Sequence, residues 1–114
     1  MAVQKFEDLL VWQKSQDLAV SIYNAFKDNN DFSFRDQIKR TSVSISNNIA
    51  EGFDRNSNAD FSRFLYFALA SNSEVRSMLY LSIRLNFLDE DESRELIEKT
   101  KLPNLNLNPP LPAK

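Results

Sequence analysis

The chain contains no cysteine and no histidine. Without cysteine it cannot form a disulfide or a thiolate metal site, and without histidine it lacks the commonest general base and the commonest metal ligand. Ser–His–Asp and Cys–His catalytic arrangements are therefore impossible, as are di-iron sites built on Glu-x-x-His. We accordingly expect a protein that is not an enzyme and that uses no cofactor, no metal and no small-molecule substrate.

Glycine is also nearly absent, since Gly52 is the only one among 114 residues. Hairpins, tight turns and phosphate-cradling loops depend on glycine, so its scarcity argues against β-structure and against nucleotide-binding loops. No apolar run reaches the roughly 18 residues that a membrane span needs, and the N-terminal sequence does not have the pattern of a signal peptide. We therefore expect a helical, cytoplasmic, single-domain protein with no membrane partner.

Four segments carry apolar residues at helical spacing, which predicts an all-α fold. They run from about Glu7 to Lys27, Phe34 to Glu51, Asn58 to Phe87, and Asp89 to Lys101. Short connections between them predict an up-down antiparallel four-helix bundle with a short fourth helix. Residues 1–102 then form the bundle domain, and residues 103–114 form a tail rich in proline and asparagine that we expect to be mobile.

Residue types at the ends of these segments predict where the helices begin and stop. Ser33, Ser57 and Asp89 are the expected N-caps. Gly52 stands where a glycine just beyond a helix would end it, and Pro103 ends the fourth helix.

Two helices have compositions that bear on their packing. The second is rich in serine, threonine and asparagine, which favours a crowded contact between helices, with a polar functional groove as the alternative. The third is apolar around so much of its circumference that a single short bundle cannot easily cover it. We expect part of the third helix to pack against another subunit.

Basic residues gather in the middle of the chain, although the net charge of the whole chain is −2. The candidate nucleic-acid-binding residues are Arg35, Lys39, Arg40, Arg55 and Arg63. Phosphate contacts need only positioned lysine and arginine side chains, so no motif is required. The alternative is a solvated helix face on which Asp36, Asp54 and Asp60 neutralise these cations.

Trp12 and Glu51 each allow two interpretations. Trp12 could stack on a base, but a tryptophan at helical spacing is more often an anchor in a core or an interface. Glu51 could be a functional carboxylate; because a negative charge opposes the dipole near a helix C-terminus, we favour a structural acceptor with a specific partner on a neighbouring helix. The candidate structural and interface residues are Trp12, Glu51, Gly52, Phe67 and Tyr80.

Three segments carry a family resemblance: FEDLLVWQKSQDLAVSIY, RDQIKRTSVSISNNIAEGF and DFSRFLYFALASNSEVRSMLYLS. They resemble the four-helix-bundle proteins encoded in intervening sequences of bacterial large-subunit ribosomal RNA genes, a family similar to the accessory variability determinant of diversity-generating retroelements. The most specific pieces are Val11-Trp12-Gln13-Lys14 and Asn48-Ile49-Ala50-Glu51-Gly52.

The resemblance implies a barrel-like homopentamer without enzyme activity and, for the retroelement relatives, a basic surface that engages nucleic acid and a reverse transcriptase. The candidate partners are therefore the chain itself, RNA or DNA, and a nucleic-acid enzyme. The chain departs from the family pattern in its Ser46, where many relatives have proline, in its short fourth helix and in its negative net charge. Two functions follow as hypotheses: an RNA- or protein-binding adaptor, and a protein-binding scaffold without nucleic-acid affinity.

Overall fold

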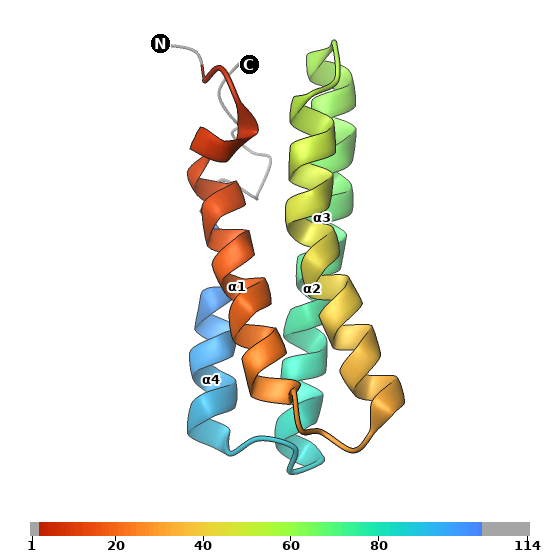
Figure 1. The fold of residues 1–114 in the computed structure, drawn as a ribbon, viewed down its shortest axis with the longest axis vertical. Helices are drawn as coiled ribbons and strands as arrows, with labels where there is room; N and C mark the ends of the chain where they lie inside the picture. The colour runs from red at the N-terminus through yellow and green to blue at the C-terminus, as the bar shows by residue number, and fades with distance from the viewer. Residues whose placement is uncertain (1–2, 104–114) are drawn as a thin grey trace.

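The computed structural model describes residues 3–103, which form four α-helices and one short 3₁₀ turn. The turn is Phe6–Asp8, and the helices are α1 (Leu10–Phe26), α2 (Phe32–Phe53), α3 (Asn58–Arg84) and α4 (Glu90–Lys99). Successive helices run in opposite directions (Figure 1). The predicted all-α, up-down four-helix bundle with a short fourth helix is confirmed, while residues 104–114 of the predicted tail lie outside the described residues.

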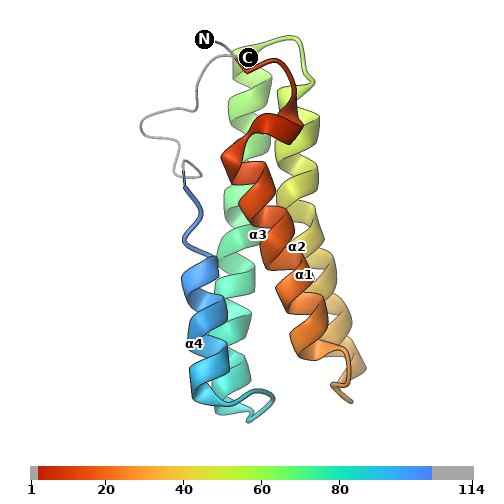
Figure 2. The same ribbon diagram turned by 60° about the vertical axis from the view of Figure 1, so that its left-hand side comes forward.

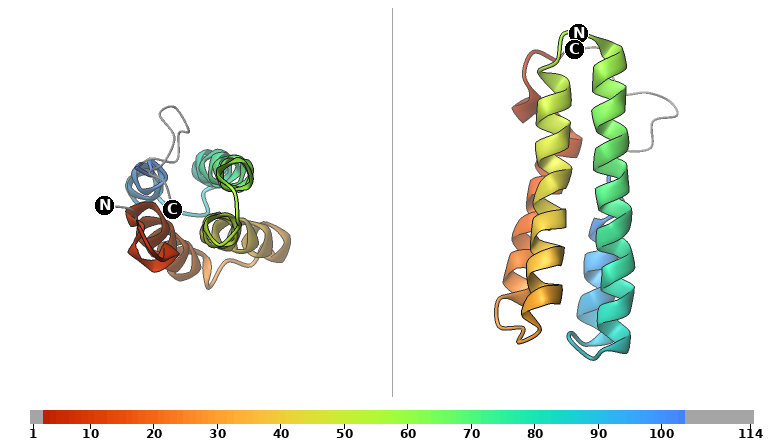
Figure 3. Two further views of the ribbon diagram at one scale, coloured as in Figure 1. Left: turned by 90° about the horizontal axis from the view of Figure 1, so that it is seen from above. Right: turned by 90° about the vertical axis from the view of Figure 1, so that its right-hand side faces the viewer.

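Seen along the bundle axis, the helices occupy four corners in chain order, so that α1 and α3 lie at opposite corners (Figure 3). The long helices α2 and α3 run side by side, whereas α4 lies only beside the end of the bundle where α3 terminates (Figure 2). No helix within residues 3–103 combines the length and the apolarity that a membrane span requires.

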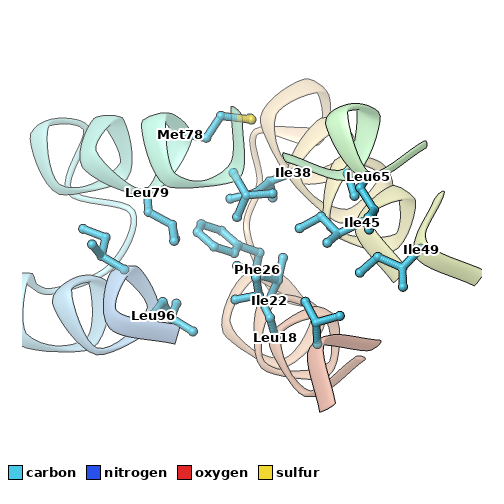
Figure 4. Packing of buried hydrophobic residues seen from close by; sticks show 14 of the residues in the cluster. Leu18, Ile22, Phe26, Ile38, Ile45, Ile49, Leu65, Met78, Leu79 and Leu96 are labelled. Carbon is cyan, nitrogen blue, oxygen red and sulfur yellow. The ribbon is translucent and has the colours of Figure 1, made fainter. Parts of the chain in front are cut away.

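The hydrophobic core follows the bundle axis and takes one stripe of side chains from each helix (Figure 4). The largest fully buried apolar side chains are Leu18, Ile22 and Phe26 of α1, Ile38, Ile45 and Ile49 of α2, and Leu65, Val75 and Leu79 of α3. Short α4 adds Leu96 and Ile97. Each such burial stabilises the fold by roughly 1.5–3 kcal/mol, which compensates for the weak helix propensity of α2.

Serine side chains occupy the places where α2 meets its neighbours. Ser42 and Ser46 are buried, and each hydroxyl donates to the backbone carbonyl three residues earlier in its own helix. Across the helix contacts, Gln16 Nε2 donates to Ser46 Oγ at 3.0 Å and Ser44 Oγ donates to Ser71 Oγ at 2.6 Å. These contacts agree with the interpretation of α2 as a crowded helix interface.

Two of the three predicted N-caps are confirmed. Ser57 Oγ accepts from the backbone N–H of Asp60 at 3.1 Å, and Asp89 Oδ1 accepts from the N–H of Glu92 at 2.7 Å. The prediction of Ser33 is wrong. Helix α2 begins two residues earlier because the Asp31 carboxylate accepts from the N–H of Phe34 at 3.0 Å, and a carboxylate suits the positive end of a helix better than a hydroxyl.

Helix α1 begins at Leu10, three residues after the predicted start at Glu7. The intervening residues form the 3₁₀ turn, and Leu9 is extended, with φ −75° and ψ 124°, so the α-helix cannot continue through it. The Leu9 side chain is buried in the core, which accounts for the break: the chain turns there to place an apolar group inside.

The expectation that Gly52 ends the second helix is wrong. Helix α2 continues through Gly52 to Phe53, and no glycine has a positive φ. A Cβ atom at position 52 would lie 2.5 Å from the Cβ of Phe64 and 3.2 Å from Cδ1 of Phe61. The only glycine therefore marks a point where the backbone of α2 lies close against α3.

Helix α3 ends at Arg84, earlier than the predicted Phe87. Asn86 takes a left-handed conformation with φ 57°, and the N–H groups of Asn86 and Phe87 donate to the carbonyls of Ile83 and Ser82 at 3.1 and 3.0 Å. This is a Schellman motif, in which asparagine occupies the position that glycine most often takes.

Helix α4 also ends before its predicted boundary, at Lys99 rather than Lys101. Two side chains of α3 hold its C-terminus: Asn72 Nδ2 donates to the Thr100 carbonyl at 2.8 Å, and the Arg76 guanidinium donates to the Thr100 carbonyl at 3.0 Å and to its hydroxyl at 2.8 Å. A cation at this end complements the helix dipole. The chain is thus stopped at Thr100 by α3, before Pro103 is reached.

Candidate functional site

Three of the candidate basic residues lie on the first turns of α2. Arg35 is half-buried, pairs with Asp36 at 3.2 Å and lies over the Phe32 ring, 4.6 Å from its centroid. Lys39 lies over the Tyr23 ring of α1 at 5.0 Å. Arg40 is exposed and is not neutralised by Asp36, one turn before it, because Asp36 pairs with Arg35 instead. We call Arg35, Lys39 and Arg40 the α2-start cluster.

The other two candidates lie at the opposite end of α2, in the connection to α3. Arg55 and Arg63 both lie over the ring of Phe64, at 4.7 and 5.2 Å from its centroid. Arg63 also pairs with Asp60 at 3.3 Å. We call Arg55 and Arg63 the connection cluster. It is separated from the α2-start cluster by most of the length of α2, about 30 Å at 1.5 Å per residue.

The five basic residues therefore form two surfaces on one chain, not one. Two of them, Arg35 and Arg63, have carboxylate partners, whereas Lys39, Arg40 and Arg55 form no ion pair with any residue in the range 3–103. Four of the five lie against an aromatic ring. The contact between Phe32 and Arg35 could be foreseen from the sequence, because the two residues are one helical turn apart. The contact between Lys39 and Tyr23 joins two helices and could not be foreseen.

Trp12 and Glu51 differ in their surroundings. Trp12 is half-buried, meets Phe6 edge-on with ring centroids 5.3 Å apart, and packs against the core. Glu51 is exposed and forms no ion pair or hydrogen bond through its side chain within the described chain. The expectation that Glu51 meets a partner on a neighbouring helix of the same chain is therefore wrong. Position 51 lies on the solvent side of α2, next to buried Gly52.

The outward side of α3 carries an unusual concentration of exposed apolar side chains. We call it the α3 outer face and define it by Tyr66, Phe67, Tyr80, Leu81 and Leu85, which are between 43% and 59% exposed. Small residues lie between the two tyrosines: Ala70, Ser73 and Ser77. The one acidic residue in this stretch, Glu74, accepts hydrogen bonds from Gln37 and Thr41 of α2, both at 3.0 Å. Its charge is thus directed toward α2.

A shallow groove lies between α1 and α2, on a different side of the bundle. It has a volume of about 340 Å³, and we call it the α1–α2 groove. Its lining residues are Gln16, Ala19, Val20, Tyr23, Asn24, Val43 and Ser46, none of which is charged. The small side chains at positions 19, 43 and 46 form the hollow, and Val20 and Tyr23 stand exposed at its edge.

These features provide surfaces for binding and no assembled set of reactive groups. Among residues 3–103 no three carboxylates come together as metal ligands. The candidate features divide into the two basic clusters, the largely apolar α3 outer face and the uncharged α1–α2 groove. Sequence reasoning had named Phe67 and Tyr80 for the third helix but missed Tyr66, Leu81 and the groove, because a groove requires two helices to be placed side by side.

Comparison with known proteins identifies a family model and a similar solved structure. The family model described as 23S rRNA-intervening sequence protein matches residues 7–105. A solved structure described as a protein with unknown function from the S23 ribosomal protein family of Bacteroides thetaiotaomicron is similar, with a TM-score of 0.76 and 28% sequence identity over 86% of this chain and 93% of that chain. No curated protein sequence matches the chain.

Proposed function

The chain belongs to the 23S rRNA-intervening sequence protein family, and from this premise we propose that it is a non-enzymatic protein that assembles with copies of itself into a ring and acts as a binding scaffold. The observation that carries the proposal is the α3 outer face. The family description refers to 23S rRNA and the matched structure is described as having unknown function, so neither supplies an activity.

The α3 outer face is difficult to account for in a monomer. Single exposed apolar residues are common, but several exposed aromatic and aliphatic residues on one side of a helix are typical of a protein–protein interface. Tyrosine and phenylalanine are also enriched in the centres of interfaces, where charged residues are depleted. Tyr66, Ala70, Ser73, Ser77 and Tyr80 follow the alternating three- and four-residue spacing of a helix-packing seam.

The α1–α2 groove supplies a second surface that suits this seam. The groove has no charged lining residue and is a hollow, whereas Tyr66 and Tyr80 project from the α3 outer face, which exposed Glu74 and Arg84 share. Because α1 and α3 lie at opposite corners of the bundle, the two surfaces face in different directions (Figure 3). A contact between unlike surfaces of identical subunits is heterologous, and it closes into a ring when the rotation permits. Five subunits are proposed, following the family resemblance.

Light scattering coupled to size-exclusion chromatography tests the assembly. We expect the mass of five chains for the wild-type protein and of one chain for Tyr66→Arg/Tyr80→Arg. The control is Leu10→Arg/Phe32→Arg, which also replaces two exposed apolar residues, 51% and 60% exposed, outside the α3 outer face and should leave the mass unchanged. A single-chain mass for the wild-type protein would refute self-assembly, and two chains would refute the ring.

Mixing two defective variants tests the unlike contact. Ala19→Arg fills the α1–α2 groove but leaves the α3 outer face intact, while Tyr66→Arg/Tyr80→Arg does the reverse. If the contact is heterologous, each variant alone is monomeric, and an equimolar mixture forms one intact interface and hence a dimer. If α3 instead packs against α3 of another copy, the two variants form no mixed dimer, and Ala19→Arg alone assembles like the wild-type protein.

A nucleic-acid surface is the second candidate function, and the unpaired cations support it. Lys39, Arg40 and Arg55 have no carboxylate partner among residues 3–103, and a ring would repeat each of them on every subunit. Repetition raises the local potential even where net charge is negative. The two basic clusters are far apart, and Arg35 and Arg63 are neutralised by carboxylates. Both observations favour the protein-binding scaffold over the RNA-binding adaptor.

Titration with labelled single- and double-stranded RNA and DNA, at low and at near-physiological salt, separates the two functions. An adaptor binds with an affinity that falls steeply with salt and is lost in Arg35→Gln/Lys39→Gln/Arg40→Gln. A protein-binding scaffold gives no binding even at low salt. Because Lys39 lies over Tyr23 at the edge of the α1–α2 groove, the oligomer mass is measured in Arg35→Gln/Arg40→Gln, which should keep the mass of the wild-type protein.

A further inference from the structure

Helix α4 covers only one end of the corner that it occupies in the bundle. It has 10 residues, against 27 in α3, and its C-terminus is held by α3 at Thr100. Helix α3 extends beyond that point, from Asn72 back to Asn58, for about 21 Å at 1.5 Å per residue (Figure 2). We call the stretch beyond Thr100, bordered by Leu10 of α1 and Leu69 of α3, the fourth corner. None of the described helices occupies it, and the 3₁₀ turn contacts α1 and α2 instead.

The face of α1 that borders the fourth corner can be followed from the residues beside α4. A groove of about 700 Å³ lies between α1 and α4, and Lys14 and Asp17 are among its lining residues. Leu10 precedes Lys14 by four positions and Asp17 by seven, so it lies on the same face of the helix, one turn further from α4. The Leu10 side chain is 51% exposed. Helix α1 therefore presents an exposed apolar side chain to the fourth corner.

The corresponding face of α3 is identified by a side chain that holds α4. The Arg76 guanidinium donates to the Thr100 carbonyl at 3.0 Å, so position 76 faces the corner that α4 occupies. Leu69 precedes Arg76 by seven positions, which is two helical turns, and lies on the same face. Leu69 is half-buried and packs against the core. The fourth corner thus has a leucine from each of the two helices that border it.

The chain that follows α4 leads to the fourth corner. The N–H of Leu102 donates to the Thr100 carbonyl at 2.9 Å, and the Leu102 side chain is half-buried against the core. Leu102 and Pro103 line the same groove as Lys14 of α1. Because Lys14 is one helical turn from Leu10, the described chain ends beside the fourth corner, and the residues after Pro103 begin there.

The sequence after Pro103 suits a position along two helices. Leu105 and Leu107 alternate with asparagine in residues 104–108. Such alternation is typical of an extended segment with one apolar side and one polar side. Two prolines follow at positions 109 and 110, which argues against a further helix. At roughly 3.2 Å per residue, about seven extended residues cover the about 21 Å of the fourth corner, so residues 104–110 are long enough.

A buried polar atom where the fourth corner begins needs a hydrogen-bond donor. Asn72 is 2% exposed, its Nδ2 donates to the Thr100 carbonyl, and its Oδ1 is buried without a hydrogen-bond partner among the described residues. A buried acceptor without a donor destabilises a protein. The N–H groups of Lys101 and Leu102 already donate to carbonyls at the end of α4, and the proline after them has none. The next N–H along the chain is that of Asn104.

We propose that residues 104–110 bind in the fourth corner of their own chain as an extended strap, with Leu105 and Leu107 against Leu10 and Leu69. The asparagine side chains of the strap face solvent, and its first N–H donates to the unpaired Oδ1 of Asn72. The strap takes the place that a longer fourth helix would have. Its contacts lie apart from the α3 outer face and the α1–α2 groove, so they do not depend on the proposed ring.

Engineered disulfides test the position of the strap in the intact chain, which has no cysteine of its own. A disulfide forms only when the two Cα atoms lie within about 7 Å of each other. Leu10→Cys is combined with Leu105→Cys and, separately, with Leu107→Cys. We expect at least one of these pairs to form a disulfide within the chain under mild oxidation, seen as faster migration in non-reducing electrophoresis.

The control replaces Leu10→Cys by Gln16→Cys in both pairs. Gln16 is an exposed residue of the same helix, but it lines the α1–α2 groove on the other side of α1, so it should not be cross-linked. Equal cross-linking of the Leu10 and Gln16 pairs, no disulfide in either Leu10 pair, or a disulfide only between chains would each overturn the proposal.

Hydrogen exchange tests whether the two leucines make the contact. Leu105→Ser/Leu107→Ser should speed amide exchange in residues 58–71 of α3 about tenfold, equivalent to about 1.4 kcal/mol, because this part of α3 loses its cover. Asn106→Ser/Asn108→Ser changes the other side of the same segment and should leave the exchange rates as they are. Equal rates in the two variants would contradict the proposal.

The oligomer mass of each variant is measured in parallel by light scattering. A missing disulfide with the mass of five chains refutes the strap alone. A single-chain mass with the disulfide formed refutes the ring alone.

Discussion

Replacing Gly52 with alanine should destabilise the protein, although alanine is the better helix former. The added Cβ would lie 2.5 Å from the Cβ of Phe64, whereas carbon atoms in contact normally lie about 3.5–4.0 Å apart. Both atoms are fixed to helix backbones, so no side-chain rotation can relieve the contact. Helices α2 and α3 would therefore have to separate by roughly 1 Å at this point.

The expected magnitude follows from two opposing effects. Overpacking of this kind costs about 1–3 kcal/mol, and replacing glycine by alanine within a helix returns up to about 1 kcal/mol. We expect a net loss of about 1–2 kcal/mol in the free energy of unfolding, with the Tm falling by roughly 4–8 °C for each kcal/mol. Urea and thermal denaturation followed by circular dichroism measure both quantities.

A comparison of Gly52→Ala with Gly52→Asn identifies the cause. If close approach to Phe64 is what requires glycine, the larger asparagine must be worse than alanine. If position 52 instead needed a left-handed conformation, asparagine would be tolerated better than alanine. The control is Ala59→Gly, at an exposed position near the start of α3, which should change stability by the propensity difference alone. An increase in stability for Gly52→Ala would refute the close approach of the two helices.

Substitutions at four further positions test the helix ends and the surface. Ser57→Ala should lower stability by about 1 kcal/mol through loss of the α3 cap, measured by urea unfolding. Asn86→Gly should be at least as stable as the wild-type protein, and Asn86→Ala should lose about 1 kcal/mol, because φ is positive there. Arg76→Ala should cost about 1.5–3 kcal/mol and speed amide hydrogen exchange in α4 before the other helices. Glu51→Ala should change stability by less than about 0.5 kcal/mol, since the side chain has no partner in the described chain; a larger loss would reveal one.

The apolar pattern predicted the helices and the core because both depend on local spacing. Val11, Leu18 and Ile22 are buried as the 3.6-residue period requires, and the same holds for Ile38, Ile45 and Ile49. The N-caps Ser57 and Asp89 were equally readable, because a cap and the N–H that it binds are three residues apart. Signals of this kind need no knowledge of how the helices are placed.

The errors arose where a residue's role is set by another helix. Gly52 was expected to be a helix terminator because its neighbours in sequence say nothing of Phe64, the residue that lies against it. The end of α4 was assigned to Pro103, whereas Asn72 and Arg76, more than twenty residues away in sequence, stop the helix at Thr100. Glu51 was given a partner on the basis of dipole repulsion alone, and none is present in the described chain.

The surfaces show the same difference between features set by local spacing and features set by another helix. Exposed apolar residues on α3 were foreseeable from a helix that is apolar on several sides, since one bundle cannot cover them all. The two grooves were not foreseeable, because each is formed by side chains of two helices whose separation is set by small residues such as Ala19, Ser21 and Ser46.

The short fourth helix links the two kinds of surface. Because α4 is fixed to α3 through Thr100 and through Ser93, it leaves a channel against α1 and contributes nothing to the outward side of α3. The α3 outer face and the side of the bundle between α1 and α4 are therefore separate and share no residue. A protein built in this way can bury the α3 outer face in an assembly and leave the side between α1 and α4 exposed to solvent.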